Sequence, residues 1–212
     1  MILALMRIAA APVIALAASS PAGSGWTLLA LAVFVLVAAA DMVDHLFMRW
    51  NMERPPLCIL VERTGDRVMV ITVLAVVIGM SASYRGAGTG ALSEVPSVLV
   101  ALPALIIVIR EVLVTALREF LSAARLPVTM LARLKTGLQI AAVFLLLLVH
   151  ALPALQMATG GGSFSVMDGP PYEREIVWAG VVLLWAAAGV TVWSAIDYFR
   201  EGWPQVVARA DH

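Results

Sequence analysis

Residues 26–48 read WTLLALAVFVLVAAADMVDHLFM, and this stretch decides the fold. Residues 26–40 carry no charge, whereas Asp41 and Asp44 lie close to the end of the stretch. A helix needs about 20 mostly apolar residues to cross the hydrocarbon core of a bilayer. Lipid offers no partner for backbone hydrogen bonds, so a segment that crosses it must be helical. The stretch therefore predicts a transmembrane helix with acidic residues near its end.

Five further apolar runs of comparable length lie between breaks that contain glycine, proline or charged residues. The six predicted spans are residues 2–20, 26–48, 66–84, 96–120, 134–152 and 175–199. The chain shows no internal repeat and no second domain, and the Gly-rich residues 159–163 are typical of a flexible loop. We therefore predict an all-α, polytopic membrane protein of about six transmembrane helices, with residues 1–212 forming a single domain.

The overall composition excludes several classes of protein. Of the 212 residues, 62% are hydrophobic and 13% are charged, too few charges to cover a water-soluble domain. Fourteen basic residues balance fourteen acidic ones, which argues against a nucleic-acid partner because such binders carry a basic excess. The single Cys58 excludes an internal disulfide. Residues 8–18 resemble a secretory signal, but the next span follows closely, so we interpret them as part of the first membrane helix.

Basic residues are distributed unevenly between the two ends of the predicted spans. One side of the membrane collects eleven of them: Arg7, Arg49, Arg54, Arg63, Arg67, Arg118, Arg125, Arg133, Lys135, Arg200 and Arg209. The other side holds Arg85 and Arg174, and Arg110 lies inside the fourth span. Because lysine and arginine concentrate in cytoplasmic loops, we expect both termini and the loops after the second and fourth spans in the cytoplasm.

Four acidic residues lie where the second span ends and the third begins. Asp41 and Asp44 are three residues apart, and Glu62 and Asp66 are four apart, so each pair shares one face of its helix if the helix of the third span begins at Glu62. Spans joined by a short connection pack as antiparallel neighbours, which brings the two pairs together. Converging carboxylates suit Mg²⁺, Mn²⁺ or Ca²⁺. In the alternative interpretation, the acids only mark the membrane boundary and pair with nearby arginines.

Two arginines occupy the fourth span, where a charge is costly and usually faces a partner or a cavity. Arg110 and Arg118 are eight residues apart and so lie on roughly the same helix face, and Lys135 opens the fifth span. Arginine and lysine side chains suit phosphate oxygens. The alternative is a set of internal ion pairs with Glu111 and Glu119. Carboxylates that hold a divalent metal, beside cations that hold phosphate, describe a phosphoryl-transfer site.

The run Asp41-x2-Asp44 … Arg49 … Glu62-x3-Asp66 resembles the signature of the CDP-alcohol phosphatidyltransferases. That signature reads D-x2-D-G-x2-A-R-x8-G-x3-D-x3-D, and all eight positions are in register here without a gap. A second set of residues resembles one branch of the family, phosphatidylglycerophosphate synthase. These residues lie at 5–8, 110–119, 134–139 and 193–198, so the resemblance covers nearly the whole chain.

The resemblance implies a two-metal active site that faces the cytoplasm in the bacterial inner membrane. There a phosphatidyl group would pass from CDP-diacylglycerol to glycerol 3-phosphate, giving phosphatidylglycerophosphate and CMP. Asp41, Asp44, Glu62 and Asp66 would hold Mg²⁺ or Mn²⁺, and Asp66 would also be the catalytic base for the attacking hydroxyl group. The family also implies a homodimer.

The same resemblance assigns the remaining site residues. Nucleotide binding falls to Arg49 together with His45 and Cys58, which stand at signature positions. Binding of the acceptor's phosphate falls to basic residues of the fourth and fifth spans, which are Arg110, Arg118 and Lys135.

Four of the eight signature positions differ from the family pattern. His45 and Cys58 replace glycines, Met48 replaces alanine and Glu62 replaces the third aspartate. A glycine lets a ligand approach the backbone closely, so a side chain in its place fills that space. We expect His45 either to obstruct the usual nucleotide position or to act as a metal ligand or a contact for another head group. Glu62 keeps the charge and the oxygen ligands but adds a methylene group.

Two other functions stay open on the sequence. The first is a paralogue of the same fold with a different acceptor alcohol or with lost catalysis. The second is a non-enzymatic transport or structural membrane protein that uses the charged spans as an ion path. A transporter of this kind shows repeated halves with matching broken helices, and the sequence contains neither.

Overall fold

The computed structural model describes residues 2–20, 24–47, 65, 68–81, 94–120, 130–159 and 172–210. All the regular secondary structure in these ranges is helical. Its helices are α1 (Ile2–Ala18), α2 (Gly25–Phe47), a helix over Val68–Ser81, α5 (Ser97–Phe120), α6 (Met130–Ala158) and α7 (Glu173–Ala210). The prediction of an all-α protein is confirmed, and each helix begins within a few residues of a predicted span.

Three of these helices are long and apolar enough to cross a membrane. The apolar segments are Ser97–Ala116 in α5, Leu134–Ala158 in α6 and Glu173–Asp197 in α7. Shorter apolar helical segments cover Ile8–Ala18, Gly25–Ala40 and Val68–Ser81. Large apolar side chains also point outward, among them Leu16 and Trp193, which are 75% and 65% exposed. An outer surface of this kind suits lipid rather than water, and the chain is a polytopic integral membrane protein.

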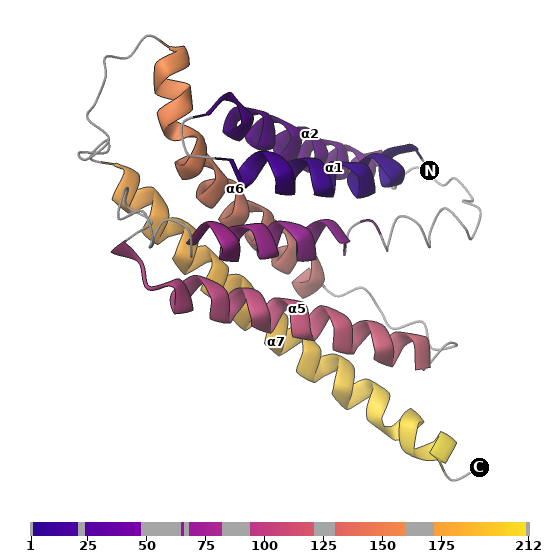
Figure 1. Ribbon diagram of the computed structural model, residues 1–212. Coiled ribbons are helices and arrows are strands. Elements are labelled where there is room, and N and C mark those ends of the chain that lie inside the picture. The colour runs from indigo at the N-terminus through magenta and orange to yellow at the C-terminus, as the bar shows by residue number, and fades with distance from the viewer. Residues whose placement is uncertain are drawn as a thin grey trace.

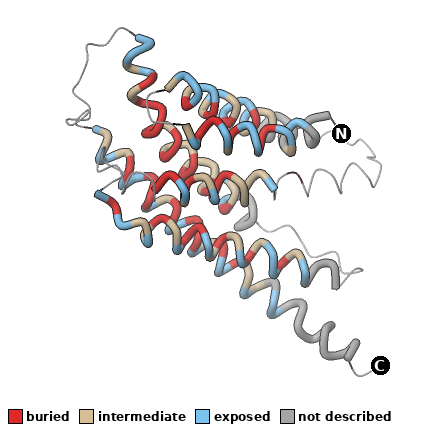
Figure 2. Tube along the Cα trace, viewed as in Figure 1, coloured by how far each residue is buried: buried red, intermediate tan, exposed pale blue. Residues whose placement is uncertain are grey.

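The helices form a bundle in which α6 occupies a central position (Figure 1). α1 and α2 pack side by side, and α6 contacts α2 on one side and α7 on the other. α7 also packs along α5. Buried side chains line the facing sides of the helices and form one core, to which Ile14, Phe34, Leu74, Ile107 and Leu146 contribute (Figure 2).

One predicted span end was wrong. The sequence places a break at Pro153, but α6 continues through this proline to Ala158. Ala151 and Ala154 on either side of it are 0% and 5% exposed, so core packing outweighs the one backbone hydrogen bond that proline cannot donate. The predicted sixth span, residues 175–199, agrees with the apolar segment Glu173–Asp197, and the helix α7 itself continues beyond it to residue 210. Loss of apolar character limits the part that can cross lipid, but it does not end a helix.

Among the described glycines, Gly180 on α7 is the one with the least room for a side chain, because α6 packs closely against it. A Cβ atom added there would lie 3.1 Å from two carbon atoms of the Leu146 side chain, which is itself buried. At Gly189, also on α7, an added Cβ would meet nothing within 4 Å.

We therefore expect Gly180→Leu to destabilise the bundle, because overpacking a filled core costs about 1–3 kcal/mol. Gly189→Leu makes the same chemical change on an exposed face of the same helix and should leave stability unchanged. Thermal unfolding of the two variants in detergent compares them directly. Equal melting temperatures would show that the contact of α6 with α7 near Gly180 is looser than the structure indicates.

Candidate functional site

The signature acids lie at and beyond the end of α2. Asp41 and Asp44 fall within the last two turns of this helix, and their spacing places them on one helix face. Their side chains, and that of His45, are outside the part of the chain that the structure describes. The other signature positions lie outside that part with both backbone and side chain; they are Met48, Arg49, Cys58, Glu62 and Asp66. Among the described residues, no group of three His, Cys, Asp or Glu side chains could hold a metal ion.

The predicted cationic residues are placed more fully. Arg110 on α5 and Lys135 on α6 come together inside the bundle, where both contact Glu111. Arg110 Nη1 lies 3.2 Å from Glu111 Oε1, and Lys135 Nζ donates to the same oxygen atom. Arg118 lies in the last turn of α5, and its side chain is outside the described residues. Two helices therefore aim one cation each at a single anionic oxygen.

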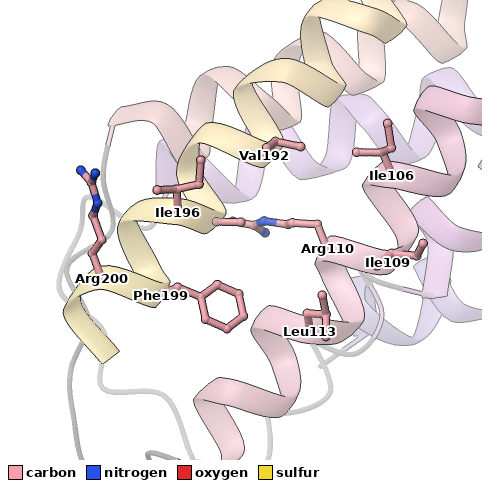
Figure 3. Close-up of a pocket in the computed structure, with 9 residues that line it drawn as sticks. Ile106, Ile109, Arg110, Leu113, Val192, Ile196, Phe199 and Arg200 are labelled. Atoms are coloured by element: carbon pink, nitrogen blue, oxygen red, sulfur yellow. The ribbon is translucent and has the colours of Figure 1, made fainter. Parts of the chain in front are cut away.

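A third helix supports this arrangement. The Arg110 side chain extends from α5 towards α7 (Figure 3), where its Nη2 donates to Ser194 Oγ at 2.7 Å. Ser194 Oγ in turn donates to the carbonyl oxygen of Thr191 at 3.1 Å. Ser194 was not predicted as a site residue. The available signal was a polar side chain inside an apolar span, within a stretch that resembles the synthase branch.

Burial gives these charges their importance. The side chains of Arg110, Lys135 and Glu111 are 9%, 10% and 14% exposed. Charges removed from water lose several kcal/mol of solvation each, and they persist only where opposite charges and hydrogen bonds replace the water. The ion pair of Arg110 with Glu111 that the sequence left as an alternative is therefore present. It does not exclude a bound anion, because arginine offers five N–H donors and lysine three.

Two further polar side chains lie one helical turn from this cluster. Gln139 follows Lys135 by four residues on α6, and Thr191 precedes Ser194 by three on α7. They are 4% and 0% exposed, and Gln139 Nε2 and Thr191 Oγ1 have no hydrogen-bond partner among the described residues. A buried polar group left in this state costs about 1–3 kcal/mol. Such atoms are normally satisfied by a ligand or by water, so the polar region extends beyond the charged residues.

The cluster predicts the behaviour of a Glu111→Gln variant. The change removes the carboxylate on which Arg110 and Lys135 converge, and breaking a buried ion pair costs about 3–5 kcal/mol. We expect a lower melting temperature that added inorganic phosphate partly restores, because phosphate oxygens can take the place of the carboxylate. Glu94→Gln is the control, since it breaks the exposed pair with Arg174 instead. A Glu111→Gln protein as stable as the parent would show that this carboxylate does not balance the two cations.

The fold and the site together define a class of protein. It is an integral membrane protein in which buried cations from α5 and α6 converge on one anionic oxygen, and α2, which carries two acids in its last two turns, packs on α6. The model of the CDP-alcohol phosphatidyltransferase family matches residues 1–193, and the chain belongs to this family of transferases.

Three bacterial relatives illustrate the similarity, and each is named CDP-diacylglycerol–glycerol-3-phosphate 3-phosphatidyltransferase. The protein of Cereibacter sphaeroides is 29% identical over 82% of this chain and 81% of its own length. That of Pseudomonas fluorescens is 26% identical over 85% and 78%. That of Rickettsia bellii is 28% identical over 93% and 91%. The similarity therefore extends over most of each protein.

Enzymes of this family generally depend on a divalent metal ion. The donor set of this chain fits such an ion in its chemistry, because Asp41, Asp44, Glu62 and Asp66 are all carboxylates. Because α2 is helical through Phe47, Asp41 and Asp44 lie on one face of this helix.

Proposed function

We propose that this protein transfers the phosphatidyl group of CDP-diacylglycerol to the hydroxyl group of glycerol 3-phosphate. The products are phosphatidylglycerophosphate, a phospholipid precursor, and CMP. The observation that carries the proposal is the convergence of Arg110 and Lys135 on one buried oxygen atom. The names of the relatives supply the reaction, and their similarity extends over the helices that hold these two residues.

In this proposal, Arg110, Arg118 and Lys135 bind the phosphate group of the acceptor. Charge-assisted hydrogen bonds to phosphate oxygens are stronger than neutral ones, and a low-dielectric surrounding strengthens them further. Glu111 keeps the donor groups of Arg110 and Lys135 close together in the absence of the acceptor. Gln139 lies one helical turn from Lys135, and its buried amide adds a neutral hydrogen bond to the acceptor in this proposal.

The chemical step falls to the acids. Asp66 accepts the proton of the glycerol 3-phosphate hydroxyl group, whose oxygen attacks the phosphorus of the phosphatidyl group. The bond from that phosphorus to the CMP oxygen breaks, and CMP leaves with the electron pair. Asp41, Asp44, Glu62 and Asp66 would hold Mg²⁺ or Mn²⁺, which supplies positive charge to the pyrophosphate when bound. Arg49 contacts the nucleotide, and His45 and Cys58 border it.

The uneven distribution of basic residues supports a site that faces the cytoplasm, in the inner membrane of a bacterium. The acids at the end of α2, and Lys135 near the start of α6, belong to the side that carries eleven of the fourteen basic residues. Residues 1–212 act as one domain in this proposal, and two copies of the chain form a homodimer.

The departures from the family signature give a prediction of their own. His45 stands where the family has glycine, and an imidazole there occupies space near the expected nucleotide. We expect His45→Gly to increase the rate of CMP release and to lower the KM for CDP-diacylglycerol. Steady-state kinetics of the variant and of the parent protein provide the comparison. A loss of activity would instead identify the imidazole as a metal ligand or a substrate contact.

Identification of the product lipid tests the proposed reaction. Purified protein in detergent is given CDP-diacylglycerol, Mg²⁺ or Mn²⁺, and one acceptor, and the extracted lipids are analysed by mass spectrometry. Glycerol 3-phosphate should give phosphatidylglycerophosphate, whereas glycerol and inositol, which lack the phosphate, should give no new lipid. Product from an unphosphorylated alcohol would assign a different acceptor. Folded protein that forms no product with either metal would identify a paralogue without this activity.

A further inference from the structure

A groove lies between α5 and α7, and the proposed reaction uses none of its lining residues except Arg110. It has a volume of about 790 Å³, and seven of its nine lining residues are apolar. Ile106, Ile109 and Leu113 form the α5 wall, and Val192, Ile196 and Phe199 stand on the α7 wall (Figure 3). Ile109 and Ile196 are 49% and 48% exposed, so the groove opens onto the outer surface of the bundle.

The groove has a polar end and an apolar end. Arg200 lies three residues beyond the apolar segment Glu173–Asp197, at the level where α7 leaves the membrane. Ile106 lies near the middle of the apolar segment Ser97–Ala116. From Val192 to Arg200 the helix rises by about 12 Å. This is close to the depth of one leaflet, about half of the 30 Å hydrocarbon core. The groove therefore extends from the membrane surface towards its middle.

The side chains favour a lipid over another protein helix. Membrane helices that pack together present small residues to each other, whereas isoleucine, leucine, valine and phenylalanine dominate this groove. Its volume lies within the range of about 300–1,000 Å³ that small-molecule sites occupy. Arg200 lines the groove at its polar end, and its side chain lies on the side of α7 away from Arg110 (Figure 3). A positive charge at that end attracts anionic lipids.

We propose that this groove binds an anionic glycerophospholipid, with one acyl chain between α5 and α7 and the phosphate group at Arg200. The site goes beyond the proposed reaction and does not depend on catalysis. Its inner wall includes the Arg110 side chain, whose guanidinium contacts Glu111 and Ser194. The lipid site and the candidate acceptor site therefore share one residue.

Native mass spectrometry of the full-length protein tests the proposal. Detergent-solubilised protein is mixed with phosphatidylglycerol or phosphatidylcholine of the same acyl composition, and retained lipid is counted. Ala195→Trp places a large side chain in the groove and should reduce retained phosphatidylglycerol several-fold. Ala186→Trp makes the same change at an exposed position of α7 outside the groove and should retain as much lipid as the parent.

Arg200→Gln tests the charge without filling the groove. Its binding of phosphatidylglycerol should fall about five-fold, the worth of one basic residue beside an anionic lipid surface. Binding of phosphatidylcholine should not change, and Arg174→Gln at the other end of α7 should affect neither lipid. Equal retention by the Ala195→Trp and Ala186→Trp proteins would overturn the proposal. The proposal would also be overturned if Ala195→Trp separated a dimer into single chains but retained as much lipid as the parent. In that case a second copy of the chain, not a lipid, would occupy the groove. If Ala195→Trp does not fold, unchanged phosphatidylglycerol binding by Arg200→Gln overturns the proposal.

Discussion

Replacing Asp66 with asparagine should lower acceptor-dependent CMP release by about 10²- to 10⁴-fold, the usual contribution of a general base. The amide has no negative charge and cannot accept the proton of the glycerol 3-phosphate hydroxyl group. Asparagine has nearly the same size, so the bundle should fold as before. Steady-state CMP release, measured at saturating CDP-diacylglycerol and metal, gives the rate.

A matched variant separates this effect from a general loss of charge. Glu94→Gln also converts a carboxylate to an amide, but its partner is Arg174, and both side chains are more than half exposed. Exposed ion pairs contribute little to stability, so the rate should equal that of the parent. A folded Asp66→Asn protein with the parental rate would remove Asp66 from the role of base.

Lys135→Met should raise the KM for glycerol 3-phosphate by about 10- to 100-fold, because a hydrogen bond to a charged group contributes about 1.5–3 kcal/mol. The side chain is only 10% exposed, and methionine fills a similar volume without the charge. The KM for CDP-diacylglycerol should change little. Kinetics in which each substrate is varied in turn separate the two constants.

The conservative variant Lys135→Arg provides the control for this prediction. It keeps the positive charge and should recover part of the affinity for glycerol 3-phosphate, although the geometry of its donors differs. If Lys135 had a purely structural role, Lys135→Met would lower the stability of the protein and would impair the kinetics with both substrates alike. An unchanged KM for glycerol 3-phosphate in Lys135→Met would place the acceptor's phosphate elsewhere.

The positions of the helices could be predicted from sequence because the membrane imposes one strict rule. Apolar runs must be helical in lipid, and the six runs correspond to the helices of the described ranges. Helix ends follow a weaker rule. At Pro153 the core packing of α6 outweighed the local preference of proline, and past residue 199 the helix outlasted its apolar surface.

The candidate site could be predicted only in part. Arg110 and Lys135 were grouped on the sequence only because both are cations, on the fourth and fifth spans, that suit phosphate oxygens. The contact of Arg110 with Ser194 joins residues 84 positions apart and depends on which face of α7 turns towards α5. Because α7 is apolar on most sides, its sequence gives little indication of that face. The groove between α5 and α7 could not be predicted either, because it depends on the same face of α7.

Release of CMP with and without glycerol 3-phosphate tests the central claim most directly. The purified parent protein is incubated with CDP-diacylglycerol and Mg²⁺ or Mn²⁺, and free CMP is measured as the acceptor is added. The proposed function predicts little CMP in its absence and a release that rises with glycerol 3-phosphate until it saturates. CMP release that is independent of the acceptor, or absent from folded protein with either metal, would contradict it.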